Sequence, residues 1–94
     1  MEIEPLLDNV VVFDIGAPYH AALLCELLQA DRLSWLYERR GVQVVAAALR
    51  ADADDLANLL RTVERWAGTR RLGPVRFELD DRNYVLQTSQ TLTV

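Results

Sequence analysis

Three residues near the start of the chain have side chains that could carry out acid–base chemistry together. Asp14 ends an apolar run and is followed closely by a glycine, and Tyr19 and His20 come directly after a proline. A strand end, a glycine and a helix start often place a carboxylate and an imidazole within reach of one another. A structural role also fits, because Asp14 could accept amide hydrogens at the helix start. If the chain is an enzyme, we expect Asp14, Tyr19 and His20 to be its catalytic residues.

Other catalytic and metal-binding arrangements are not supported. His20 and Cys25 are five residues apart, so they do not share one helix face and do not form a nucleophile–base pair. Asp52, Asp54 and Asp55 lack the glycine and the distant glutamate of a calcium loop, and helix capping accounts for them. We therefore expect no metal site and no cofactor, and a protein without enzymatic activity.

Composition limits the classes of partner. The 94 residues are 51% hydrophobic and 26% charged, with a net charge of −4, which is typical of one folded domain. All ten basic residues are arginines without a basic stripe, so no nucleic-acid partner is expected. No apolar stretch is long enough for a membrane span. The single cysteine and the acidic N-terminus favour a cytoplasmic location.

The elements that would position these residues can be read from periodicity and turn chemistry. We expect strands over residues 9–16, 42–49, 74–80 and 84–88, and helices over residues 18–29 and 52–68. Residues 31–40 fit two structures. Alternating Leu33, Trp35 and Tyr37 favour a strand leading through a bulged turn into residue 42, whereas Asp31 and Gly41 could also bound a helix.

The strand reading predicts an α+β fold: a ferredoxin-like βαββαβ sandwich with an extra C-terminal hairpin strand. The alternative is a βαβ-type α/β domain in which residues 31–40 are helical. Either fold makes residues 1–94 a single domain, with residues 1–8 as an N-terminal arm and residues 89–94 as a loose or extended tail.

One sheet face of the ferredoxin-like sandwich has no helix over it. On residues 9–16 we assign the bulkier Val11, Phe13 and Ile15 to the helices, so that the lighter set faces away. Both alternating sets of residues 42–49 are largely apolar, so either one leaves apolar side chains on the free face. The interface residues that we predict on that face are Val10, Val12, Leu36, Val45, Ala47 and Leu49.

An apolar sheet face with a polar rim usually marks an association surface. We therefore expect a protein-interaction or regulatory module that forms a homodimer, or docks on a protein partner, through this face or through the C-terminal edge strand. The alternative is a small-molecule-binding domain or a small dimeric ferredoxin-like enzyme that uses the same face.

Overall fold

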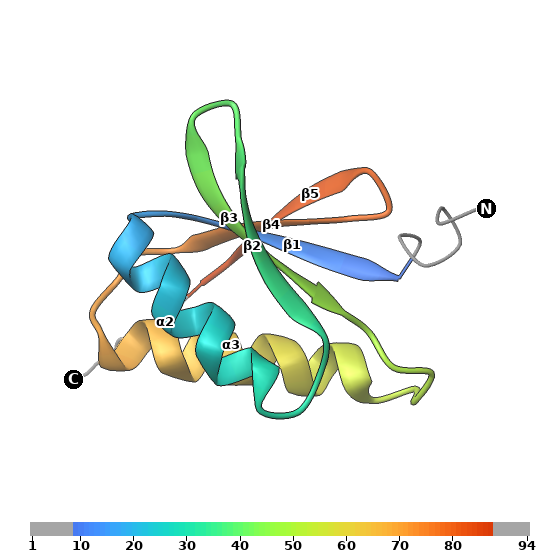
Figure 1. The fold of residues 1–94 in the computed structure, drawn as a ribbon. Helices are drawn as coiled ribbons and strands as arrows, with labels where there is room; N and C mark the ends of the chain where they lie inside the picture. Colours follow the sequence, from blue (N-terminus) through green and yellow to red (C-terminus); the bar gives the residue numbers. More distant parts are fainter. Residues whose placement is uncertain (1–8, 88–94) are drawn as a thin grey trace.

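The computed structural model describes residues 9–87, which form one layer of strands and one layer of helices (Figure 1). The strands are β1 (Val10–Gly16), β2 (Ser34–Arg39), β3 (Val42–Ala48), β4 (Val75–Leu79) and β5 (Arg82–Leu86), and the helices are α2 (Pro18–Gln29) and α3 (Asp55–Thr69). The expected arm and tail, residues 1–8 and 89–94, lie outside the described residues.

The five strands form a single antiparallel sheet in the order β2-β3-β1-β4-β5. Both helices lie on one side of it, while the β2–β3 and β4–β5 hairpins extend away from the helices (Figure 1). The chain is therefore a small α+β domain with two helices and a five-stranded antiparallel sheet. No helix within residues 9–87 is long and apolar enough to cross a membrane.

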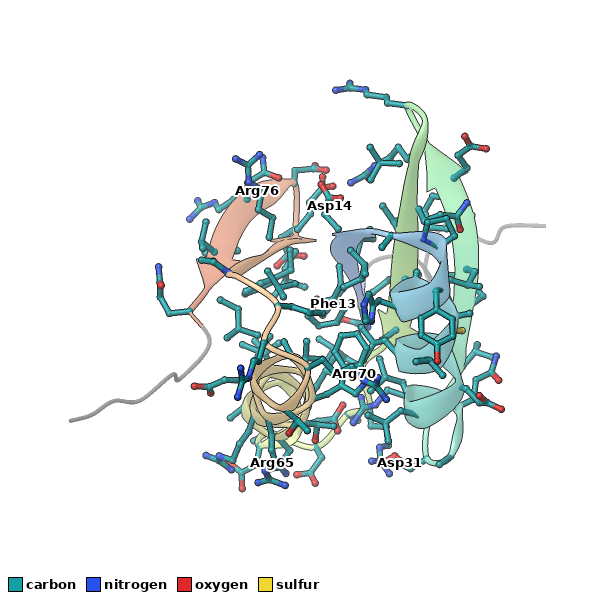
Figure 2. All side chains as sticks on the ribbon, turned by 90° about the vertical axis from the view of Figure 1, so that its left-hand side faces the viewer. Phe13, Asp14, Asp31, Arg65, Arg70 and Arg76 are labelled. Atoms are coloured by element: carbon teal, nitrogen blue, oxygen red, sulfur yellow. The ribbon has the colours of Figure 1, made fainter. Side chains whose placement is uncertain are left out.

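The core lies between the sheet and the helices. Phe13 of β1 is fully buried there, and its cross-strand neighbours are Val45 of β3 and Phe77 of β4. Leu24 of α2 and Val63 of α3 cover these residues from the helix side. Figure 2 shows Phe13 between the sheet and the helices. The expected placement of Val11 and Phe13 toward the helices is confirmed, because both are 0% exposed members of this core.

Residues 34–39 form the edge strand β2, so the helical alternative for residues 31–40 is wrong. The predicted bulged turn is also wrong. Arg39 pairs with Val42, which leaves a two-residue loop in which Arg40 (φ 55°) and Gly41 (φ 78°) both have positive φ. Positive φ at both central residues defines a type I′ turn, whose twist matches that of the flanking strands.

The β4–β5 turn is built in the same way. Leu79 pairs with Arg82, and the two residues between them, Asp80 and Asp81, have φ values of 55° and 63°. Aspartate tolerates this left-handed conformation better than most residues. Strand β5 consequently starts at Arg82, two residues earlier than expected.

The structure corrects the face assignment on β3 and β2. Val45 and Ala47 are paired with Phe13 and Val11 and are 0% exposed in the core. Leu36, paired with Val45, and Leu49, packed against the core, belong to the same side. Four of the six predicted interface residues therefore lie on the helix-covered side of the sheet, and only Val10 and Val12 do not.

A buried ion pair joins the start of α3 to the loop before β2. The Arg32 guanidinium donates to both carboxylate oxygens of Asp55, at 2.7 and 2.9 Å, and both side chains are 4% exposed. The Arg50 amide donates to the same carboxylate at 2.7 Å. The buried Asp55 carboxylate thus accepts hydrogen bonds from a guanidinium group and from a backbone amide. A buried carboxylate stays ionised only when it has such partners.

Candidate functional site

The candidate site is the sheet face opposite α2 and α3, which we call the open face. Register fixes its members, because directly paired residues project from the same side of a sheet. They are Val10, Val12 and Asp14 of β1; Trp35, Tyr37 and Arg39 of β2; Val42, Val44, Ala46 and Ala48 of β3; Arg76 and Glu78 of β4; and Asn83 and Val85 of β5.

The floor of the open face is apolar, and large side chains cover part of it. Val44 and Ala46 are 2% and 0% exposed, although no helix lies on their side of the sheet. Their paired neighbours on the edge strand β2 are Tyr37 and Trp35, and both aromatic side chains line the same hollow as Ala46. A partner approaching this face would therefore meet aromatic rings and the half-buried valines of β1 before it met the alanines.

One ion pair spans the open face. Arg39 of β2 donates to Glu78 of β4 at 2.8 Å, although β3 and β1 lie between these two strands. Neighbouring strands are spaced by about 4.8 Å, so two extended side chains bridge a gap of about 14 Å only where the sheet curls. The open face is therefore concave, with the β2–β3 and β4–β5 hairpins as its two walls (Figure 1).

The ion pair lies at the boundary of two hollows. The first, which we call the aromatic hollow, has a volume of about 640 Å³. Trp35 and Tyr37 line it from β2, and Asp80 and Asp81 line it from the β4–β5 turn. With Arg39 and Glu78 offsetting each other, the two aspartates give this hollow a net charge of −2 beside two aromatic faces. Such surroundings favour a cation.

The second hollow, which we call the basic hollow, lies on the other side of the ion pair. Its volume is about 520 Å³, and its lining includes Asp14, Arg40 and Arg76. Figure 2 shows Asp14 and Arg76 next to each other at one end of the sheet, as their pairing in the β1–β4 register requires. Two guanidinium groups against one carboxylate give this hollow a net positive charge.

Several charged side chains around the open face have no partner within residues 9–87. Arg40, Asp80 and Asp81 are exposed at the two hairpin turns and make no side-chain hydrogen bond or ion pair there. Their charges remain available to a binding partner.

The predicted catalytic residues are not brought together. Asp14 lies on the open face, whereas His20 lies on the helix side, with its ring 6.2 Å from that of Trp66. Tyr19 is 69% exposed on α2, and the centre of its ring lies 5.5 Å from that of the His20 ring. Within residues 9–87, no hydrogen bond or ion pair links Asp14 to either of them. The sheet itself separates the carboxylate from the imidazole.

His20 instead belongs to a cluster with Trp66 and Arg70. The Arg70 guanidinium lies 5.7 Å from the centre of the Trp66 ring, on which the His20 ring also packs edge-on. The His20 Nδ1 atom is buried without a hydrogen-bond partner in the described structure. This packing supports a structural role for His20.

Residues 9–87 contain no group of three or more histidine, cysteine or carboxylate side chains placed to hold a metal ion. Comparisons of the chain with models of known protein families, with curated proteins and with solved structures find no match.

Proposed function

We propose that the domain has the ferredoxin-like arrangement, with β5 added at one edge. The first six elements follow the order strand, helix, strand, strand, helix, strand. Within the sheet, β2-β3-β1-β4 are neighbours, all antiparallel, and both helices lie on one face. Both features fit the split βαβ pattern, which leaves the opposite face of its sheet free of helices.

With this fold, one face of the sheet is free of helices, and the domain acts as a non-enzymatic interaction module that self-associates through this open face. The observation that carries the proposal is the construction of that face, in which an apolar floor and two aromatic side chains are surrounded by charged residues. An apolar centre within a polar rim is the usual anatomy of a protein interface. Trp35 and Tyr37 are of the residue types that contribute most to binding energy at such surfaces.

The C-terminal edge strand is a weaker route to association. Strand β5 exposes Tyr84 and Val85, at 42% and 53%. However, the Tyr84 ring already stacks on Phe77 with centroids 5.2 Å apart, so much of its apolar surface is used within the chain. We therefore place the main interface on the open face.

A second candidate function is binding of a small molecule on the same face. Its support is the volume of the aromatic hollow, about 640 Å³, which lies within the range of about 300–1,000 Å³ that is common for ligand sites. Charge and aromatic character point to a cationic ligand. A thermal shift with quaternary ammonium and guanidinium compounds, lost in Trp35→Ala, would favour this candidate.

The experiment that tests self-association compares solution mass across a concentration series for the native chain, Val12→Lys and Leu27→Lys. Val12 lies in the floor of the open face and is only partly buried, so the longer lysine side chain can extend away from the sheet. Leu27 is a matched control, an apolar residue 43% exposed on α2. We expect a native dimer, an unchanged dimer for Leu27→Lys and a folded monomer for Val12→Lys, because an ammonium group in an apolar interface is costly. A dimeric Val12→Lys protein would contradict the proposal.

A further inference from the structure

The two hairpin turns lie at diagonally opposite corners of the open face. The β2–β3 turn is next to the end of β1, where Gly16 pairs with Gln43. The β4–β5 turn is next to the start of β1, because Val12 pairs with Glu78 shortly before that turn. The hairpins also lie on opposite sides of β1 in the sheet. Figure 1 shows both turns projecting away from the helices.

These two corners carry opposite, unpaired charges. Arg40 is exposed at the β2–β3 turn, and Asp80 and Asp81 are exposed at the β4–β5 turn. None of the three has an ion pair within residues 9–87. The ion pair between Arg39 and Glu78 lies between the corners and leaves these outer charges free.

Opposite charges on a diagonal make the face complementary to itself. When two copies pack with their open faces together, the two-fold axis lies in the plane between them. An axis perpendicular to the diagonal brings the basic corner of each copy over the acidic corner of the other. The same contact then forms twice, as an isologous interface requires.

From this symmetry we infer that a second copy of the chain occupies the open face and that its Arg40 enters the aromatic hollow. This inference rests on the proposed self-association. There the guanidinium lies between the carboxylates of Asp80 and Asp81 on one wall and the rings of Trp35 and Tyr37 on the other. Ion pairing and cation–π attraction act on the same group, and both strengthen as water leaves the hollow.

The structure allows a charge swap that preserves both turns. Arg40 and Asp80 occupy the first position of equivalent turns and have the same φ of 55°. Arg40→Asp therefore places a residue type that tolerates this backbone, and Asp80→Arg places one that the other turn already holds there. Asp81→Asn removes the second negative charge with a residue that suits positive φ.

The test measures dissociation constants by sedimentation for R40D, for D80R/D81N and for their equimolar mixture. Each variant alone places like charges at both corners of its own dimer, and we expect its self-association to weaken at least about tenfold. In a mixed dimer of the two variants, each hairpin turn of one copy lies against a turn of opposite charge on the other copy. We expect a mixed dimer whose dissociation constant lies within about threefold of the native value, since the number of attractive contacts is restored.

Arg65→Asp on α3 is the control for charge alone, because Arg65 lies on the helix side of the molecule (Figure 2). We expect its dissociation constant to equal that of the native chain. If R40D and D80R/D81N also dimerise like the native chain while Val12→Lys is monomeric, this inference is overturned and the open-face interface stands. If the native chain is a monomer throughout, or Val12→Lys remains a dimer, the proposed function fails and this inference fails with it.

Discussion

Arg39 and Glu78 form an ion pair of 2.8 Å across two intervening strands, from one edge of the four-stranded unit to the other. Such a contact is possible only on a curled sheet, and it divides the open face into an acidic aromatic half and a basic half.

The Arg39–Glu78 pair should contribute little to folding stability. The two side chains are 43% and 28% exposed, so water and salt weaken their attraction. In a double-mutant cycle with Arg39→Gln and Glu78→Gln, we expect a coupling energy below about 1 kcal/mol, decreasing with added salt. Urea unfolding at low protein concentration measures it. A coupling energy that is large and independent of salt would mean that the pair is buried, contrary to its exposure here.

The Arg32–Asp55 pair should behave in the opposite way. Asp55→Asn leaves the Arg32 guanidinium buried without an anion, and we expect a loss of about 3–5 kcal/mol in the free energy of unfolding. Asp52→Asn, at an exposed position in the segment just before α3, is the control and should change the free energy of unfolding by less than about 0.5 kcal/mol. Urea unfolding of both variants checks the contrast, and equal effects would contradict the account of Asp55.

Acid should destabilise the fold through Asp55. Its hydrogen bonds from Arg32, followed by that from the Arg50 amide, lower the pKa of this carboxyl from 3.8 to about 2. The unfolded chain therefore binds the proton more readily than the folded chain. The stabilisation is fully present above pH 4 and is lost as the pH falls toward 2, by about 2 kcal/mol in total.

The free energy of unfolding measured from pH 5 to pH 2 tests this. Asp55→Asn should lack this part of the acid dependence, because the substituted side chain does not titrate. A variant that loses stability with acid as steeply as the native chain would assign the effect to other carboxylates.

The two sides of the sheet should respond differently to a new charge. Val45→Asp places a carboxylate among Phe13, Leu24 and Val63, and we expect it to cost more than about 3 kcal/mol or to prevent folding. Val12→Lys should cost less than about 1 kcal/mol at concentrations where the native chain is monomeric. Circular dichroism during urea unfolding distinguishes them. Similar losses for both would contradict the face assignment.

Which side of the sheet each strand residue faces could be predicted from the sequence on β1 but not on β3. On β1 the alternation is informative, since Phe13 marks one side and Asp14 the other. On β3 both alternating sets are mainly valine and alanine, so period-two patterning does not identify the buried side. Only pairing with β1 decides it, because Val45 lies opposite Phe13.

Strand β2 misled the prediction for a related reason. Its aromatic residues have the size and hydrophobicity of core residues, yet Trp35 and Tyr37 lie on the open face, while small Ser34 is 4% exposed on the other side. The Ser34 hydroxyl is satisfied there by donating to the Ala46 carbonyl at 2.8 Å. A buried serine whose hydroxyl bonds to the backbone of a neighbouring strand carries no signal in the local sequence.

The charged contacts could not be anticipated at all. Arg39 and Glu78 are 39 residues apart, and Arg32 and Asp55 are 23 apart. Both pairs depend on how elements distant in the sequence pack together, which no local pattern specifies. The helix and strand boundaries depend on local patterns, and the prediction for α2, residues 18–29, is confirmed in full.

The central claim, that a second copy covers the open face, can be tested with the two tryptophans as probes. In the chain labelled with fluorotryptophan, Trp35 reports on the open face, and Trp66, 9% exposed between the helices, is an internal control. A Trp35→Phe sample assigns the two fluorine resonances. We predict that the Trp35 resonance shifts with protein concentration while the Trp66 resonance stays fixed. A Trp35 resonance that does not change over the range in which the solution mass doubles would contradict the claim.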